Sequence, residues 1–248
     1  MNKYAAWHWD GAGPEPSALG YRQVNQVNES ADLSVDGHAL RVATMADGLE
    51  SSSHLVINVE KYGANNVPVA VRLANAARVA NPSVFIGAYV SQANGDKWGL
   101  CGRLQVPRDN MLAVEQVRTT LDQLAPWVDF WLVDMHFSEK NDSAIEFWNT
   151  TARATQEIIV TQRVAMLEAY DKPWWGVMNV MAVPSRDKGR ATFAGSEWVY
   201  EQAAWCRAKG ADAVYVMVWD DARKKAEGVG RVACTPEIQK TLANIGKL

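Results

Sequence analysis

Short apolar segments alternate with longer amphipathic segments along most of the chain, and this alternation constrains the fold more than any other feature. The short segments are rich in Val, Ile, Phe, Tyr and Trp and are almost continuously apolar, which is typical of strands covered on both faces. Six of them predict β-strands, and a weaker seventh candidate lies at 39–44. The six are residues 4–9, 55–59, 84–90, 130–135, 175–181 and 214–219.

The segments between these runs have the apolar spacing of α-helices. Asp109 is suited to cap the start of one helix, Pro236 suits the first turn of another, and Gly210 is placed to end a third. Strands that alternate with helices predict βαβ units and a parallel sheet. The expected helices are 67–80, 109–124, 142–170, 196–209 and 235–245.

This order predicts an α/β fold, a (β/α) barrel of the TIM type with seven or eight mostly parallel strands. The length of 248 residues is close to the usual size of such a barrel, and we expect a single domain over 1–248. An open parallel sheet is the alternative, but no glycine-rich phosphate loop follows any of the strands. The Gly/Pro-rich segment 11–20 is expected to be a loop over one end of the barrel.

Composition narrows the range of partners. A net charge of −3 gives no electrostatic reason to expect nucleic acid or an anionic membrane surface. The three cysteines, Cys101, Cys206 and Cys234, lack metal-type spacing, and no apolar run predicts a signal peptide or a membrane span. We therefore expect a soluble chain made in the cytoplasm, without cofactor or metal. Its final location and its place in a larger assembly are left open.

Polar and aromatic residues gather where the expected strands end. In a barrel of this type the carboxyl ends of the strands carry the chemistry. The amino ends are plainer, so the asymmetry points to a site. The candidates are Trp9, Asp10, Asn58, Glu60, Tyr89, Asp134, His136, Asn179, Trp219 and Asp220.

The two-residue period of a strand gives these candidates directions. Asn58 and Glu60 are two apart and should face the same way, with Val59 facing the other way. A carboxyl group in an apolar, aromatic mouth is desolvated, which raises its pKa toward the range of a general acid. The chain has 11 tryptophans, whose flat faces stack on sugar rings. Carboxylates and tryptophans together predict a carbohydrate site.

Other chemistries are less well supported. Ser91 has no GxSxG context, and Cys101 in its GLCGR loop has no evident base. His8, Asp10, Glu60 and His136 offer a metal-dependent alternative, but neither HxH nor HExxH spacing occurs.

Five short motifs between Leu55 and Asp221 resemble the hyaluronidase-like group of glycoside hydrolase barrels. The motifs are INVE at 57–60, GAY at 87–89, VDFWLVD at 128–134, KPWWGVMNV at 172–180 and GADAVYVMVWDD at 210–221. The resemblance implies a barrel that cleaves glycosidic bonds. It also implies that Glu60, the glutamate of the family's D-x-E pair, is the general acid/base.

The departure from this motif concerns Asn58, which stands where the family has an aspartate that positions the substrate's acetamido group. An amide can donate and accept hydrogen bonds but supplies no charge. One alternative is that Asp134 or Asp220 serves as the second carboxylate. The other is that the chain does not cleave carbohydrate and instead binds it or has a structural role in a larger assembly. Trp9 and Trp219 are expected to stack on sugar rings. Tyr89, His136 and Asn179 are expected to orient them, and Asp10 and Asn58 to contact the substrate.

Overall fold

The computed structural model describes eleven stretches of the chain. These are residues 1–7, 16–27, 33–59, 66–90, 118–119, 121–135, 153–179, 181–182, 192–193, 195–218 and 236–248.

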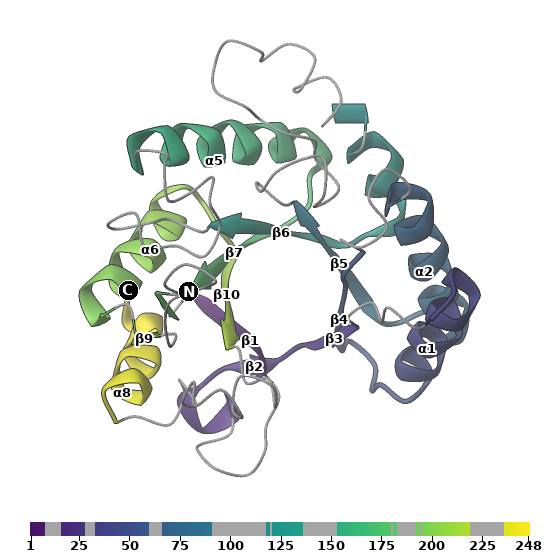
Figure 1. Ribbon diagram of the computed structural model, residues 1–248, viewed down its shortest axis with the longest axis horizontal. Helices are drawn as coiled ribbons and strands as arrows, with labels where there is room; N and C mark the ends of the chain where they lie inside the picture. Colours follow the sequence, from purple (N-terminus) through teal and green to yellow (C-terminus); the bar gives the residue numbers. More distant parts are fainter. Residues whose placement is uncertain are drawn as a thin grey trace. The chain divides into compact units, whose positions relative to one another are not determined.

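The described strands form one eight-stranded parallel sheet with helices between the strands, which confirms the predicted (β/α) fold of the TIM type (Figure 1). The eight strands follow the order β2-β1-β10-β7-β6-β5-β4-β3, and β8 pairs with β9 in a separate antiparallel ribbon. Their bounds are β1 Asn2–Trp7, β2 Arg22–Gln23, β3 Asn25–Val27, β4 His54–Ile57, β5 Phe85–Val90, β6 Phe130–Met135, β7 Trp174–Asn179, β8 Met181–Ala182, β9 Thr192–Phe193 and β10 Ala213–Val218.

The helices fall largely where the sequence predicts them. Pro236 begins α8, and Gly210 follows α6 with a φ of +82°, a left-handed conformation that glycine adopts without strain. The α-helices are α1 Val35–Asp47, α2 Asn66–Ala80, α5 Arg153–Leu167, α6 Ser196–Ala208 and α8 Pro236–Asn244. Short 3-10 helices are η1 Pro16–Leu19, η4 Ala125–Trp127, η5 Glu168–Tyr170 and η7 Ile245–Lys247.

The weaker strand candidate at 39–44 is wrong, because these residues lie inside α1. The buried residues of α1 are His38, Val42 and Ala46, which recur at the four-residue spacing of one helix face. Ser34 caps this helix, since its side chain accepts a hydrogen bond from the Gly37 N–H at 3.1 Å.

Strands β2 and β3 were not predicted. Residues 22–27 read RQVNQV, so the apolar Val24 and Val27 are three apart instead of two, and the usual strand signal is missing. Pro16–Leu19, expected to be part of a loop, forms the 3-10 helix η1. Residues 109–117 and 142–152 of the predicted helices lie outside the described residues.

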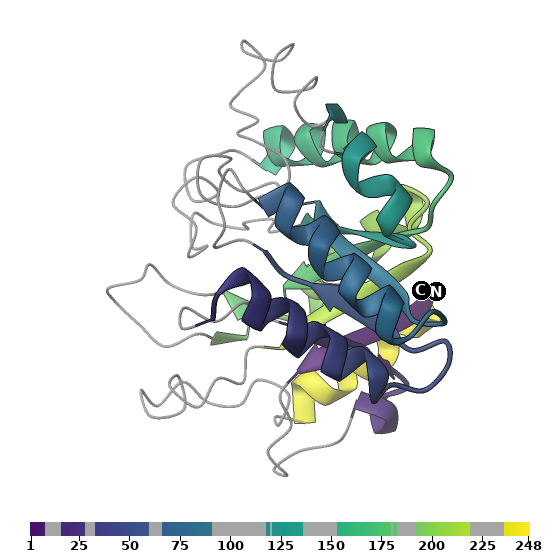
Figure 2. The same cartoon turned by 90° about the vertical axis from the view of Figure 1, so that its right-hand side faces the viewer.

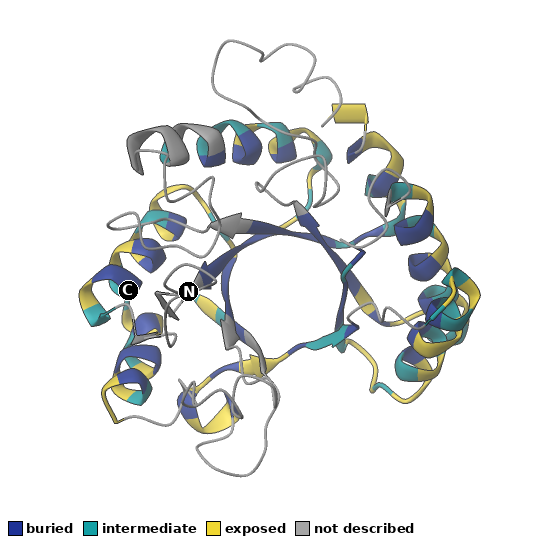
Figure 3. Ribbon diagram, in the orientation of Figure 1, coloured by how far each residue is buried: buried dark blue, intermediate teal, exposed yellow. Residues whose placement is uncertain are grey.

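The chain divides into two compact units built from interleaved segments. One comprises Met1–Gln23, Asp134–Thr161 and Trp175–Leu248, and the other Val24–Val133 and Gln162–Trp174. The second unit holds β3, β4 and β5 and the helices α1 and α2, which lie side by side (Figures 1 and 2). Figure 3 shows β4 and β5 as mostly buried ribbons, whereas α1 and α2 each show a buried and an exposed face.

In the second unit, Asp129 ties the start of β5 to α2. Its carboxylate pairs with Arg78 of α2 and accepts the Ile86 N–H at 2.7 Å. Arg78 also donates to the Val84 carbonyl at 3.1 Å. Charge-assisted hydrogen bonds of this kind are among the stronger ones in proteins, so the pair fixes where β5 begins.

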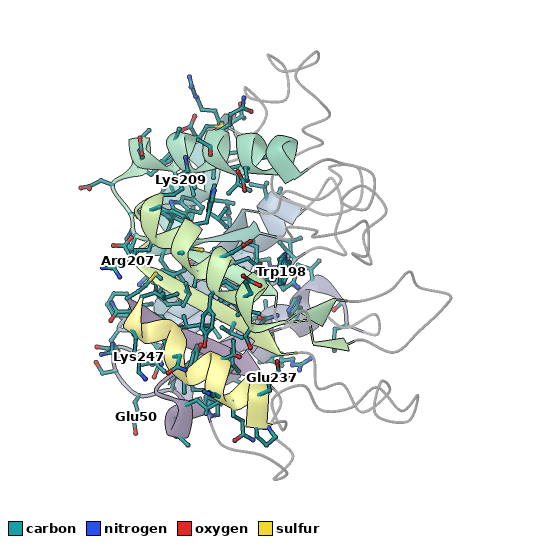
Figure 4. The ribbon with its side chains drawn as sticks, turned by 90° about the vertical axis from the view of Figure 1, so that its left-hand side faces the viewer. Glu50, Trp198, Arg207, Lys209, Glu237 and Lys247 are labelled. Atoms are coloured by element: carbon teal, nitrogen blue, oxygen red, sulfur yellow. The ribbon has the colours of Figure 1, made fainter. Side chains whose placement is uncertain are left out.

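In the first unit, aromatic side chains link β1 to β7 and the residue before β2 to α8. Tyr4 of β1 stacks on Trp175 of β7, with ring centroids 3.9 Å apart. The buried Tyr21 donates its hydroxyl hydrogen to the Leu242 carbonyl of α8 at 3.0 Å. Helices α6 and α8 pack together, and Figure 4 labels Trp198 on α6 and Glu237 on α8.

Candidate functional site

In the second unit, β3, β4, β5 and the first part of β6 present two distinct faces. Val27, Ile57, Ala88 and Trp131 occupy paired positions in successive strands, so they lie on one face. Trp131 on that face makes an edge contact with Tyr170 of η5, which continues α5. This face is therefore the helix-covered one, and the alternate residues lie on the opposite face.

Two of the predicted site residues lie on this opposite face at the same level. Ile57 pairs with Ala88, so Asn58 and Tyr89, each one residue further on, are neighbours on β4 and β5 at their carboxyl ends. The Asn58 N–H donates to the Val27 carbonyl at 3.1 Å, which extends the β3–β4 ladder by one bond. Val59 is only 4% exposed whereas Asn58 is half-buried.

Tyr89 is held by a residue that the sequence did not single out. Its hydroxyl donates to Gln26 Oε1 at 3.0 Å, and Gln26 belongs to β3. The bond therefore spans two strands, with β4 between them. Tyr89 is 8% exposed and Gln26 is half-buried, so the bond lies at the boundary between the core and the carboxyl end of the strands.

The layer below Tyr89 on the same face is closely packed. Gly87 pairs with Phe130 and Tyr89 with Leu132 in the β5–β6 ladder. A Cβ atom at Gly87 would lie 2.2 Å from Phe130 Cε2 and 2.9 Å from Leu132 Cδ1. Only glycine leaves room for the Phe130 ring here, which gives the G-x-Y motif a packing role beneath the tyrosine.

Six of the other predicted site residues lie outside the described residues: Trp9, Asp10, Glu60, His136, Trp219 and Asp220. Asp134 lies one residue before the end of β6, and Asn179 is the last residue of β7. The roles of these eight residues stay predictions.

Within the described stretches of the chain, no group of three His, Cys, Asp or Glu side chains is arranged to hold a metal ion. The metal-dependent alternative rests on His8, Asp10, Glu60 and His136, which all lie outside those stretches. No helix in the same stretches combines the length and apolar character needed to cross a bilayer.

Comparison with protein-family models finds no matching family, and comparison with curated sequences finds no match. Among solved structures, the chain is similar to a protein from Bacteroides thetaiotaomicron assigned as an alpha-L-fucosidase, with a TM-score of 0.50 and 10% identity over 86% of this chain and 66% of that one. Bee venom hyaluronidase has a TM-score of 0.45 and 11% identity over 73% and 53% of the two chains. A 7,8-dihydropteroate synthase from Vibrio fischeri has a TM-score of 0.35 and 10% identity over 94% and 83%.

The present chain thus spans 66% and 53% of the length of the first two of these structures. Identities near 10% show a shared fold and no more. The fold is one that glycoside hydrolases use. Since one barrel architecture supports many reactions, the function has to be argued from the site.

Gln26 is the residue of this site that sequence reasoning missed. A strand at 22–27 has to be recognised before Gln26 can be placed, and its apolar residues do not alternate. The available signal was indirect: a barrel needs a strand between those at 4–9 and 55–59, and the segment between them contains Val24 and Val27. Even with β3 predicted, the sequence would not identify Gln26 as the partner of Tyr89, because β3 and β5 are not adjacent strands.

Proposed function

We propose that this chain is a glycoside hydrolase that cleaves a glycosidic bond in an oligo- or polysaccharide by carboxylate general acid/base catalysis. The observation that carries the proposal is the pair of neutral hydrogen-bonding residues, Asn58 and Tyr89, side by side at the carboxyl ends of β4 and β5. Catalytic groups in this fold come from the carboxyl ends of strands. Amides and phenols there suit the hydroxyl groups of a sugar, each of which both donates and accepts.

Glu60 is the proposed general acid/base. It follows Asn58 by two residues, so continued alternation directs it to the same face as Asn58 and Tyr89. Asp134 or Asp220 is the proposed second carboxylate, since two carboxyl groups are the usual requirement for this reaction. Trp9 and Trp219 are proposed to stack on sugar rings, and Asp10, His136 and Asn179 to contact the substrate.

A second candidate function is a carbohydrate-binding or structural protein, alone or in a larger assembly, that does not cleave its ligand. Asn58 favours this reading, because an aspartate occupies the corresponding place in the barrels that the INVE motif resembles. Both functions predict binding of an oligosaccharide, and only the first predicts products.

Glu60→Gln tests the proposal directly. The amide keeps the size of the side chain but carries no transferable proton, so kcat/KM on a panel of oligosaccharides and aryl glycosides should fall about 10²- to 10⁴-fold. Binding of the same ligands, measured by calorimetry, should change little. Glu50→Gln is the matched control, since Glu50 is exposed in a turn, and it should behave as the wild type.

Asp134→Asn and Asp220→Asn identify the second carboxylate, which is the one whose loss abolishes turnover as strongly as Glu60→Gln. NMR of the first product anomer then gives the stereochemistry, and retention implies carboxyl groups about 5–5.5 Å apart. Unchanged turnover in Glu60→Gln would exclude Glu60 from the chemistry. Binding without products in the wild type would leave the second function.

A further inference from the structure

We propose that Gln26 is a positioning residue of this site, which fixes the Tyr89 side chain and determines how its hydroxyl group meets the substrate. The inference rests on the proposed function, because it concerns a substrate contact in the same site. It goes further by giving a role to a residue on a strand that none of the sequence motifs includes.

The geometry of the Tyr89–Gln26 bond is the first argument. Gln26 pairs with Val56 in the β3–β4 ladder, whereas Tyr89 stands level with Asn58, one layer closer to the carboxyl end. The 3.0 Å bond from the Tyr89 hydroxyl to Gln26 Oε1 therefore crosses β4 and bridges the one-layer offset between the two residues. Gln26 in this way holds the Tyr89 hydroxyl toward β4, the strand that leads to Asn58.

Burial makes this bond more than a surface contact. Tyr89 is 8% exposed and Val56, beneath it, is fully buried. A largely buried phenol hydroxyl is costly to leave without a partner, so the bond favours the Tyr89 rotamer that reaches Gln26. Loss of the Gln26 acceptor would remove this preference.

Hydrogen-bond direction is the second argument. A tyrosine hydroxyl has one proton, and Tyr89 donates it to Gln26 Oε1. Any further hydrogen bond at Tyr89 Oη is therefore one that the oxygen accepts. Gln26 in this way makes Tyr89 an acceptor, suited to receive a hydrogen bond from a sugar O–H or from an acetamido N–H.

The test compares Gln26→Met, Gln26→Glu, Tyr89→Phe and the Gln26→Met/Tyr89→Phe double variant. Methionine keeps the length of the side chain without an acceptor, whereas glutamate keeps the acceptor. Gln26→Met and Tyr89→Phe should each raise KM about 3- to 10-fold with little change in kcat, as expected for one lost neutral hydrogen bond. The KM of Gln26→Glu should stay within about threefold of the wild-type value, because a glutamate oxygen can still accept the Tyr89 hydroxyl hydrogen.

The double variant separates positioning from a general effect on folding. If Gln26 acts through Tyr89, the double variant should have the KM of Tyr89→Phe alone, because the two residues form one unit. Gln23→Met, at an exposed position of β2, is the matched control and should match the wild type. If Gln26→Met fails to fold, Gln26→Asn takes its place, since its shorter side chain keeps the amide but cannot reach Tyr89.

Three results overturn the inference: effects that multiply in the double variant, an unchanged KM in Gln26→Met, or a Gln26→Glu variant as weak as Gln26→Met. Each is seen in a protein that still cleaves its substrate, so each leaves the proposed function standing. A wild-type protein that cleaves no glycoside contradicts the proposed function itself, and the inference with it.

Discussion

Replacement of Gly87 by alanine should destabilise the protein strongly, although it adds a single methyl group. The new Cβ would lie 2.2 Å from Phe130 Cε2 and 2.3 Å from Cζ, whereas carbon atoms in contact sit about 3.5–4.0 Å apart. The ring or β5 must therefore move by more than about 1 Å. Phe130 is 2% exposed and Leu132 is fully buried, so neither side chain has space into which it can shift.

The magnitude follows from the cost of overpacking. Extra methylene groups in a tight core cost about 1–3 kcal/mol, and this site belongs at the upper end, since Phe130 and Leu132 both obstruct the methyl group. The lower backbone entropy of unfolded alanine offsets about 0.4–1 kcal/mol of this cost. A net loss of about 2 kcal/mol corresponds to a fall in Tm of about 4–8 °C for a chain of this size.

The assay is thermal and urea unfolding followed by circular dichroism, with Gly48→Ala as the matched control. Gly48 has a φ of −79°, and its added Cβ would meet nothing nearer than the Met45 carbonyl at 3.7 Å. Gly48→Ala should be neutral or slightly stabilising. Phe130→Leu should relieve Gly87→Ala, with a coupling free energy of about 1 kcal/mol or more. Equal stability of the two alanine variants would refute the packing argument.

Three further predictions concern charge. Asp129→Ala should lower the free energy of unfolding by about 2 kcal/mol, because it removes the ion pair with Arg78 and the acceptor of the Ile86 N–H. The side chains of Arg78 and Asp129 are 32% and 27% exposed. A urea midpoint equal to that of the wild type would contradict the prediction. In the proposed mechanism, Asn58→Asp should move the basic limb of the pH–rate profile upward, because an added carboxylate two residues from Glu60 raises the pKa of the proposed general acid. An unmoved limb would separate the two residues. Burial raises the pKa of the Cys206 thiol above its ordinary 9.0, so this contribution to stability is complete below about pH 9 and falls above it as the unfolded thiol ionises. Unfolding free energies between about pH 8 and 11 should therefore decline less steeply in Cys206→Ala than in the wild type, and equal slopes would contradict the assignment.

Local periodicity was enough to predict most of the described strands and helices. The run at 130–135 coincides with β6, and Pro236 begins α8. The same reasoning failed at 39–44, where buried positions four apart belong to α1. It also failed at 22–27, where the apolar residues are three apart. Periodicity indicates which face of a segment is buried, and it gives no prediction when the buried positions do not repeat.

The sequence by itself determined the alternation of most strands and helices, hence the fold class, and it predicts polar residues at the carboxyl ends of the strands. The tertiary structure alone decided that Gln26 receives the Tyr89 hydroxyl across β4 and that Gly87 makes room for Phe130. The physical reason is that burial patterns are local along a strand, whereas cross-strand neighbours depend on register and on side-chain reach. The spacing of Asn58 and Glu60 predicts that they share a face, whereas no spacing in the sequence predicts the partner of Tyr89.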